Sequence, residues 1–412
     1  MKSPQESVIT LLGNNSGRNL GDATILASIL SEFKKTIPNG KFYVPSVIPS
    51  FISKHYSQKY NVKGVNVLPW TGSIRLLGLP TIWCMAKSKI AMICDGIIFG
   101  RHLFSPHNFL ITLFFLVPWA KLVGCKLVCF CCGIGPFPNR LSKIMARYLI
   151  NSCDLIIMRD ADSIALAKEI GVTKEMHLAG DIALTNEVSS RERGIEILKE
   201  KGLDPSLPIL GLNITPYFDS WLKKEERMEN KEAFVRHFVE GVSAAQAKLE
   251  QEHGYSKVQK GFISCSPMDQ GLCEEVAERC GAVVINNVDY LSHDIQAVMR
   301  ECSLILAMRF HCLILSTGVG VPVASLMYAP KVKSYMSLLH SVPYGLELSK
   351  ATSNEIENLI VVAWRNRESL RIEQQRAIEE LRMTAHGAVK MVTERYFSEV
   401  ADDLFVTSSK AI

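Results

Sequence analysis

The feature that most constrains this chain is a regular alternation of short apolar runs with amphipathic segments of helical period. This alternation is typical of βα units, in which helices cover both faces of a parallel sheet. The expected strands lie within residues 7–12, 90–99, 126–131, 154–158, 208–213, 260–264, 303–307 and 321–326. The expected helices are 23–35, 139–151, 162–170, 190–201, 231–251, 271–280, 311–318 and 354–397, the last broken near His386 and Gly387.

The length of 412 residues exceeds what one ordinary hydrophobic core organises, so two domains are expected. A turn-rich break, GLDPSLP, supplies the boundary. We expect an N-terminal Rossmann-like domain over 1–203, a C-terminal Rossmann-like domain over 204–385, and a C-terminal helix and tail over 386–412. The predicted fold class is therefore α/β, with two Rossmann-like domains facing a central cleft.

The charge balance is mild, with 46 basic and 41 acidic residues. Without a dense Lys/Arg block, nucleic acid is a poor candidate partner. An ordinary solvated surface explains the balance, and anionic small molecules or an anionic membrane surface stay open as partners. Cys129, Cys131 and Cys132 stand in an apolar run that reads as a buried strand, and buried free thiols behave as small hydrophobes. The 12 cysteines therefore indicate a reduced cytosolic protein without a metal site.

The most lipophilic stretch is 109–120, FLITLFFLVPWA. It is too short to span a bilayer and contains Pro118, so a core helix is favoured over an element that docks on a membrane. The first residues lack the long apolar run of a signal peptide. We expect a cytoplasmic protein, with a location at the inner face of the membrane as the open alternative.

Ligands of open α/β sheets bind at the carboxyl ends of strands, so the loops after strands are the candidate sites. The first such loop, 13–22, reads GNNSGRNLGD and contains Asn19, Gly21 and Asp22. Glycines permit close approach of the backbone, and the following helix start favours an anion. An equally weighted alternative makes Asp22 a simple N-cap.

Two further loops carry weaker signals. Gly133-Ile134-Gly135-Pro136 forms either a structural turn or a ligand contact. In Arg159-Asp160-x-x-Ser163, the Asp and Ser are typical helix caps, while Arg159 at a strand end is a candidate ligand contact. Gly180-Asp181 follows the next short strand.

The strongest signal is the pair Arg309 and His311, between an apolar strand and a helix. An Arg guanidinium binds phosphate or carboxylate through two parallel hydrogen bonds, and His exchanges a proton near neutral pH. The helix start at the same place favours an anion. Downstream, Lys331 is either a second cation at this site or a solvated side chain.

Taken together, these motifs resemble the polysaccharide pyruvyltransferase family. The matching pieces are N-x-G-D at 19–22, GIGP, RDxxS, Gly180-Asp181, R-x-H at 309–311, G-x-P at 320–322 and Y-x-P-K at 328–331. The resemblance implies a fold similar to GT-B transferases. It also implies phosphoenolpyruvate as the donor, a saccharide or lipid-linked saccharide as the acceptor, a pyruvate ketal as the product, and no cofactor.

The chain departs from the family pattern at a few places. Residues 95–102 stand where the family commonly has a glycine-rich triplet, Ala23 replaces a usual acidic residue, and Ile182 replaces a frequent Pro. Most of these changes fall in the half expected to hold the acceptor, so they bear on acceptor identity. Arg101 and His102 in the changed loop are candidate acceptor contacts or additions to the anion site.

These observations assign roles as a hypothesis. Arg309, helped by Lys331, holds the donor's anionic groups, and His311 donates a proton or stabilises the leaving phosphate. Asp22 serves as the base for the acceptor hydroxyl, and Asn213 and Thr215 line the donor pocket. Two rival functions stay open: a GT-B glycosyltransferase that uses a nucleotide sugar, and a non-catalytic saccharide-binding protein of a glycan-assembly complex. A homo-oligomer is also left open.

Overall fold

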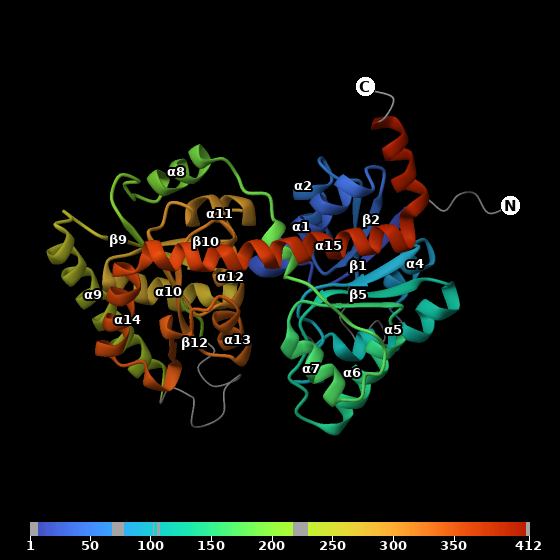
Figure 1. Ribbon diagram of the computed structural model, residues 1–412, viewed down its shortest axis with the longest axis horizontal. Helices are drawn as coiled ribbons and strands as arrows, with labels where there is room; N and C mark the ends of the chain where they lie inside the picture. Colours follow the sequence, from blue (N-terminus) through green and yellow to red (C-terminus); the bar gives the residue numbers. More distant parts are fainter. Residues whose placement is uncertain (1–6, 68–77, 102, 105–107, 217–229, 409–412) are drawn as a thin grey trace. The chain divides into compact units, whose positions relative to one another are not determined.

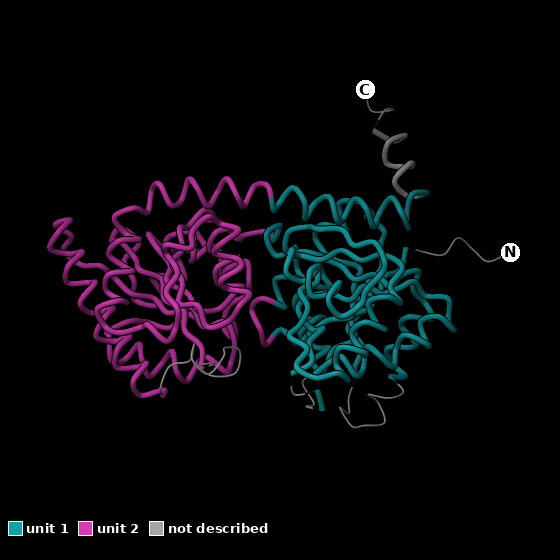
Figure 2. The backbone as a smooth tube through the Cα atoms, turned by 60° about the horizontal axis from the view of Figure 1, so that its bottom comes forward, with its two compact units in different colours: residues 1–17, 22–186, 381–412 teal, residues 18–21, 187–380 magenta. Residues whose placement is uncertain are grey.

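The computed structural model describes residues 7–67, 78–101, 103–104, 108–216 and 230–408. The chain divides into two compact units (Figure 2). Unit 1 comprises Met1–Gly17, Asp22–Asn186 and Leu381–Ile412, and unit 2 comprises Arg18–Gly21 and Glu187–Glu380.

Unit 1 is built on a seven-stranded parallel sheet in the order β3-β2-β1-β4-β5-β6-β7. Its strands are β1 Val8–Leu12, β2 Lys41–Ser46, β3 Val62–Asn66, β4 Ile90–Ile93, β5 Lys126–Cys132, β6 Leu155–Met158 and β7 His177–Leu178. Its helices are α1 Leu20–Thr36, α2 Pro49–Tyr56, α4 Leu79–Ala86, α5 Leu110–Val123, α6 Arg140–Ser152, α7 Ala161–Glu169 and the short 3₁₀ helix η1 Ile182–Thr185. The first two residues of α1 are counted with unit 2.

Unit 2 is built on a six-stranded parallel sheet in the order β10-β9-β8-β11-β12-β13. Its strands are β8 Ile209–Asn213, β9 Gln259–Ser264, β10 Val283–Asn286, β11 Leu304–Ala307, β12 Val323–Met327 and β13 Gly345–Glu347. Its helices are α8 Arg191–Glu200, α9 Lys231–His253, α10 Pro267–Cys280, α11 Ser292–Met299, α12 Phe310–Gly318, α13 Pro330–Leu338 and α14 Ser353–Arg365 (Figure 1), with short 3₁₀ turns η3 Val342–Tyr344 and η4 Leu348–Lys350.

The two sheets share one topology. In each, the first strands are added one after another on one side of a central strand, and the later strands are added on its other side. The reversal falls between β1 and β4 in unit 1 and between β8 and β11 in unit 2. Adjacent strands are in parallel register, with Leu12 beside Ile93 and Ala307 beside Asn213. A crevice for ligands is expected outside the carboxyl ends of such strands, at the point of reversal.

The cysteines contribute to the apolar interior, as the sequence predicted. All 12 lie in the described part of the chain, and all are buried and free. Burial raises the pKa of the Cys84 and Cys302 thiols to about 12, so both stay protonated and pack as hydrophobes.

The units divide at Asn186/Glu187, whereas the sequence analysis placed the boundary at 203/204. The difference arises because α8 packs with α11 of unit 2. A Cβ on Gly194 of α8 would lie 2.5 Å from the carbonyl oxygen of Ala297, so the two helices are in close backbone contact. The Arg191 guanidinium also donates two hydrogen bonds to Glu301 at 3.0 Å. The turn-rich break at 202–208 therefore lies inside unit 2.

The C-terminal helix α15, Arg367–Ser408, runs through both units, up to Glu380 in unit 2 and from Leu381 in unit 1. The break expected near His386 and Gly387 is wrong, since the helical backbone departs from helical angles at Phe397 instead. Gly387 is exposed, and a Cβ there would meet nothing within 4 Å. His386 lies 2.8 Å from the Glu32 carboxylate of unit 1.

Within the described residues, no helix is long and apolar enough to cross a membrane. The lipophilic stretch forms α5, which buries Leu113, Leu116 and Val117 against the sheet. The prediction that 109–120 forms a core helix therefore holds for the buried side of α5.

Two helical glycines of unit 2 make matched probes of packing. Gly241 in α9 has no room for a Cβ, which would lie 2.6 Å from the Ser353 carbonyl oxygen, whereas a Cβ on Gly271 in α10 meets nothing within 4 Å. We expect Gly241→Ala to lower the melting temperature by separating α9 from α14. Gly271→Ala should raise stability by about 0.5–1 kcal/mol, because Ala loses less backbone entropy in a helix. Thermal unfolding followed by circular dichroism measures both, and equal effects of the two changes would contradict the packing.

Candidate functional site

In unit 2 the site is built where β11 ends and α12 begins. Arg309 is the N-cap of α12, and its backbone N–H donates a 2.8 Å hydrogen bond to Oδ1 of Asn213 at the end of β8. Nδ2 of Asn213 donates to the Ile263 carbonyl in β9, also at 2.8 Å. Asn213 thus ties three strand ends together while only 1% exposed. Its amide is committed to positioning Arg309, and its predicted contact with the donor stays a prediction.

The Arg309 side chain is held by a buried carboxylate that the sequence analysis missed. Asp269, the third residue of α10, is fully buried and pairs with Arg309 through two parallel hydrogen bonds, the Nε–Oδ2 bond being 2.9 Å. Burial lowers the pKa of Arg309, but the Asp269 carboxylate outweighs this and raises the pKa above its usual value. The guanidinium therefore stays charged, and its 14% exposed side chain is fixed in one orientation.

His311 is the second residue of α12 and packs against the loop that carries Gly21. A Cβ on Gly21 would lie 2.0 Å from Nδ1 of His311, so only glycine leaves the imidazole its place. This loop is fastened to unit 2, since the Leu20 N–H donates to the Cys265 carbonyl at 2.8 Å and Asn287 Nδ2 donates to the Arg18 carbonyl at 2.9 Å. Residues 18–21 and His311 are far apart in the sequence, but they lie against each other in unit 2.

The start of α1 differs from the expected one. The helix begins at Leu20 rather than at Ala23, and Oδ1 of Asn19 accepts a 2.9 Å hydrogen bond from the Gly21 N–H. Asn19 therefore caps the helix, and the alternative prediction that Asp22 is the N-cap is wrong, since Asp22 lies in the first turn. A carboxylate there is favoured by the helix dipole.

Lys331 and Thr215 lie near this arrangement at different depths. Lys331 is exposed in the first turn of α13, and its Nζ is 5.7 Å from the ring centroid of Phe310, the neighbour of His311. Thr215 is fully buried. Burial raises the pKa of Asp269, while Arg309 and the Thr215 hydroxyl oppose that rise. The predicted contact of Thr215 with the donor stays a prediction.

In unit 1, Asp22 belongs to a polar chain of contacts at the ends of β1 and β4. Nδ2 of Asn14 donates to Oδ2 of Asp22 at 2.6 Å, and the Asn14 N–H donates to Oδ2 of Asp95 at 3.2 Å. Asp95 is buried and has a φ of 65°, a left-handed conformation that costs energy for residues other than glycine. From the sequence, Asp95 was only the start of an altered loop. Its position two residues after the end of β4 was the available signal.

Arg159 anchors the neighbouring loops of unit 1. It is 7% exposed, and its Nη1 lies 3.0 Å from Oδ2 of Asp181. A Cβ on Gly133 would lie 2.4 Å from this guanidinium, so the first glycine of GIGP makes room for Arg159. The predicted capping by Asp160 is confirmed, because its side chain accepts a hydrogen bond from the Ser163 N–H. A substrate contact of Arg159 stays a prediction.

The altered loop is described in part. Arg101 is half-buried, and its carbonyl accepts a 2.9 Å hydrogen bond from Asn108 Nδ2. His102 lies outside the described residues. The acceptor contacts expected of both residues stay predictions.

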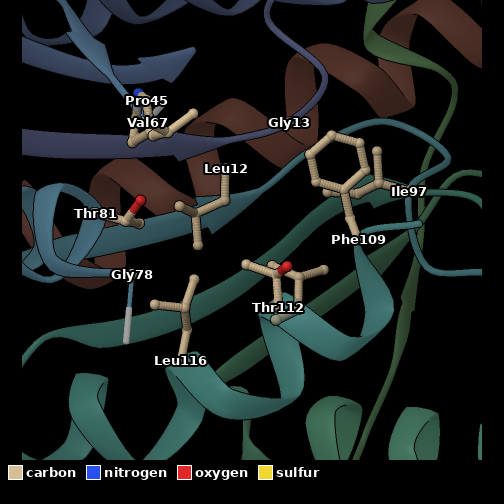
Figure 3. Close-up of a pocket in the computed structure, with 11 residues that line it drawn as sticks. Leu12, Gly13, Pro45, Val67, Gly78, Thr81, Ile97, Phe109, Thr112 and Leu116 are labelled. Carbon is tan, nitrogen blue, oxygen red and sulfur yellow. The ribbon is translucent and has the colours of Figure 1, made fainter. Parts of the chain in front are cut away.

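A small cavity of about 70 Å³ lies in unit 1 near the ends of β1 and β4, beside α5 (Figure 3). Its lining is mainly apolar and includes Leu12, Ile97, Phe109 and Leu116, with the hydroxyl of Thr112 as one polar group. A polar sugar ring would find few hydrogen-bond partners there. The polar chain from Asp22 to Asp95 is therefore the better candidate for contact with hydroxyls.

Comparison with known proteins gives a family and a fold. The model of a family described as polysaccharide pyruvyl transferase matches residues 19–330. No significant match was found among curated protein sequences.

Among solved structures, the chain is similar to a putative UDP-N-acetylglucosamine 2-epimerase from Listeria monocytogenes, with 10% identity, a TM-score of 0.61, and coverage of 95% of this chain and 97% of that one. It is also similar to the UDP-GlcNAc 2-epimerase of Methanocaldococcus jannaschii, with 11% identity, a TM-score of 0.60, and coverage of 94% and 99%. At such identities the likeness concerns the fold alone. The predicted fold class, two Rossmann-like α/β domains of the GT-B-like type, is confirmed.

The Arg309–Asp269 pair yields a stability prediction. Asp269→Ala leaves a buried cation without its partner and should destabilise unit 2 by about 3–5 kcal/mol. Combining Asp269→Leu with Arg309→Met removes both charges and should recover most of that loss. Urea unfolding of the single and double variants measures the coupling. An Asp269→Ala protein as stable as the parent would show that the pair does not organise this region.

Proposed function

The chain belongs to the polysaccharide pyruvyl transferase family, and on that premise we propose that it transfers the pyruvyl group of phosphoenolpyruvate to two hydroxyls of a saccharide, forming a ketal and releasing phosphate. The observation that carries the proposal is the arrangement at the start of α12. A fixed Arg309 cation at the N-cap and the His311 imidazole in the first turn stand at the same helix end, within the residues matched by the family.

The chemistry explains why these groups suit the donor. The methylene carbon of phosphoenolpyruvate gains a proton, which leaves an oxocarbenium-like centre at its neighbour. One sugar hydroxyl adds to that centre, phosphate departs with its bridging oxygen, and a second hydroxyl closes the ketal. The two hydroxyls lose two protons in all. One makes up for the proton that the new methyl group has taken up, and the other leaves with phosphate. The protein must therefore bind a donor with two anionic groups, a phosphate and a carboxylate, supply a proton and exclude water.

On the donor side, Arg309 supplies a permanent cation whose orientation Asp269 fixes, and the N-terminal turn of α12 adds a favourable dipole. We assign His311 as the proton donor or the stabiliser of departing phosphate. Lys331, exposed at the start of α13, supplies a second cation. Because two hydrogen bonds of Arg309 already go to Asp269, we assign it charge stabilisation rather than the full bidentate grip that the sequence suggested.

On the acceptor side, we assign Asp22 of unit 1 as the base that takes the hydroxyl proton. Its carboxylate is held by the Asn14 amide at 2.6 Å. Arg101 and Arg159 are retained as candidate acceptor contacts. The acceptor class that best fits a family acting on polysaccharides is a growing glycan, free or carried on a lipid.

The direct test is incubation with phosphoenolpyruvate and a panel of saccharides, with phosphate release and the mass of each acceptor as readouts. Acceptor-dependent phosphate release and a gain of one pyruvyl unit support the proposal. Turnover of a nucleotide sugar without phosphate release from phosphoenolpyruvate would favour a glycosyltransferase instead. Saccharide binding without any turnover would favour a binding protein.

Two variants test the catalytic arrangement. His311→Ala should reduce phosphate release by about 100-fold or more, because a positioned acid–base group is lost. Gly21→Ala should preserve the helix but displace the imidazole, and a misplacement of about 1 Å can cost about 100-fold in rate. Gly387→Ala is the matched control, since a Cβ there meets nothing within 4 Å. Full activity of both Gly21→Ala and His311→Ala would remove His311 from the mechanism.

Arg309→Lys addresses donor binding separately. Lys keeps the positive charge but cannot make the paired hydrogen bonds to Asp269, so the cation loses its fixed direction. We expect a KM for phosphoenolpyruvate raised by about 10-fold or more. An unchanged KM would make Arg309 a structural residue only.

A further inference from the structure

Exposed apolar side chains are unevenly spread over the molecule. Of the sixteen large hydrophobic residues that are exposed in the described part, eight lie between residues 79 and 148. The most exposed of these eight are Phe104 at 77%, Leu122 at 75% and Leu79 at 63%. Single exposed apolar residues are normal on a protein surface, but a cluster within one segment of one unit indicates a surface that meets something apolar.

The centre of this cluster is formed by α5 and α6, which pack side by side (Figure 1). We define the α5–α6 face as the exposed side chains Phe115, Leu122, Leu141, Ile144 and Tyr148 of these two helices, together with the partly buried Phe114. The three α6 residues recur at helical spacing, so they share one side of that helix.

Ring contacts join the two helices into one surface. The rings of Phe114 and Tyr148 have centroids 5.0 Å apart. Lys121 Nζ lies 5.9 Å from the Tyr148 ring, so a cation stands at the same seam. The opposite side of α5 is buried in the core of unit 1. The α5–α6 face is therefore held rigidly by the fold.

Charge in the chain segment that contains this face is one-sided, with Glu169 of α7, outside the segment, paired to Lys143 of α6 at 3.1 Å. Between Glu32 and Asp154 the chain has 15 Lys and Arg residues and one acidic residue, Asp95. The two helices themselves contain no acidic residue. Their Lys121, Arg140 and Arg147 are exposed. The net charge of +5 for the whole chain conceals this imbalance, because the remainder is acidic.

We propose that the α5–α6 face docks on the surface of an anionic lipid bilayer, with its apolar side chains among the acyl chains and Lys121, Arg140 and Arg147 at the anionic headgroups. Exposed apolar and aromatic side chains with exposed cations on the same two helices match the layered chemistry of a bilayer interface. A second copy of this chain would bring the same cations face to face. A nucleic acid would use the cations but leave Leu122, Leu141 and Ile144 in water.

Docking is independent of the proposed chemistry. One consequence rests on the proposed function: a protein held at a bilayer would meet a saccharide acceptor carried on a lipid. The test below reads lipid binding alone, so failure of the pyruvyl transfer proposal would leave its result intact.

The test is flotation of the full chain with vesicles of phosphatidylcholine alone and of equal parts phosphatidylcholine and phosphatidylglycerol. The protein should float with the anionic vesicles and bind neutral ones more weakly. Leu122→Ser with Leu141→Ser should weaken binding by about 10-fold or more, because apolar burial is lost. Lys121→Gln, Arg140→Gln and Arg147→Gln together should weaken it by about 10- to 100-fold at low salt, each cation near an anionic surface adding about 1 kcal/mol.

Matched controls carry the same changes outside the face. Val288→Ser with Ile372→Ser alters side chains that are 69% and 60% exposed in unit 2 and should leave binding unchanged. Lys257→Gln, Arg279→Gln and Arg300→Gln remove three exposed unit 2 cations and should have a small effect. Equal losses in test and control sets would overturn the proposal. Binding of RNA without binding of vesicles would also overturn it. So would self-association, measured by light scattering, that is lost only in the Leu122→Ser, Leu141→Ser variant.

Discussion

Parallel strands impose the constraint on which this structure depends. Because every strand must be followed by a crossover, all carboxyl ends of a sheet lie along one edge, and the chain can reverse its direction of building only at the first strand. Both units use that reversal, at β1 and β4 and at β8 and β11. The loops that carry Asp95, Asn213 and Arg309 begin at these places. Within each unit, the place of the candidate residues thus follows from topology before any side chain is considered.

Each unit then places a buried Arg–Asp pair beside its reversal. Arg309 with Asp269 orders the loop before α12, and Arg159 with Asp181 orders the loops after β5 and β6. Such pairs add little net stability, because desolvation offsets much of the attraction, but they fix orientation. A guanidinium held in this way needs no reorganisation when an anion arrives, which is the condition for electrostatic stabilisation in catalysis. Glycines at 21 and 133 provide the space that these arrangements need.

The surface of unit 1 is a separate consequence of its composition. Part of a long run with a single acidic residue, Asp95, forms two neighbouring helices with apolar outer sides. The sequence of 109–120 predicts a core helix, with a membrane-docking element as the alternative. In the structure α5 has a buried side and an exposed side, so these alternatives are compatible.

The sequence by itself determined the class of fold, the presence of two units and the order of the motifs, since apolar period and strand-end residues are local signals. Strands β2 and β3 escaped prediction because Pro45 and the polar residues of β3 interrupt the apolar pattern. Only the tertiary structure decided that α8 belongs to unit 2, that Asp269 holds Arg309 and that Gly21 lies against His311. These are contacts between residues far apart in the chain. Their partners are selected by packing and burial, which leave no periodic trace in the sequence.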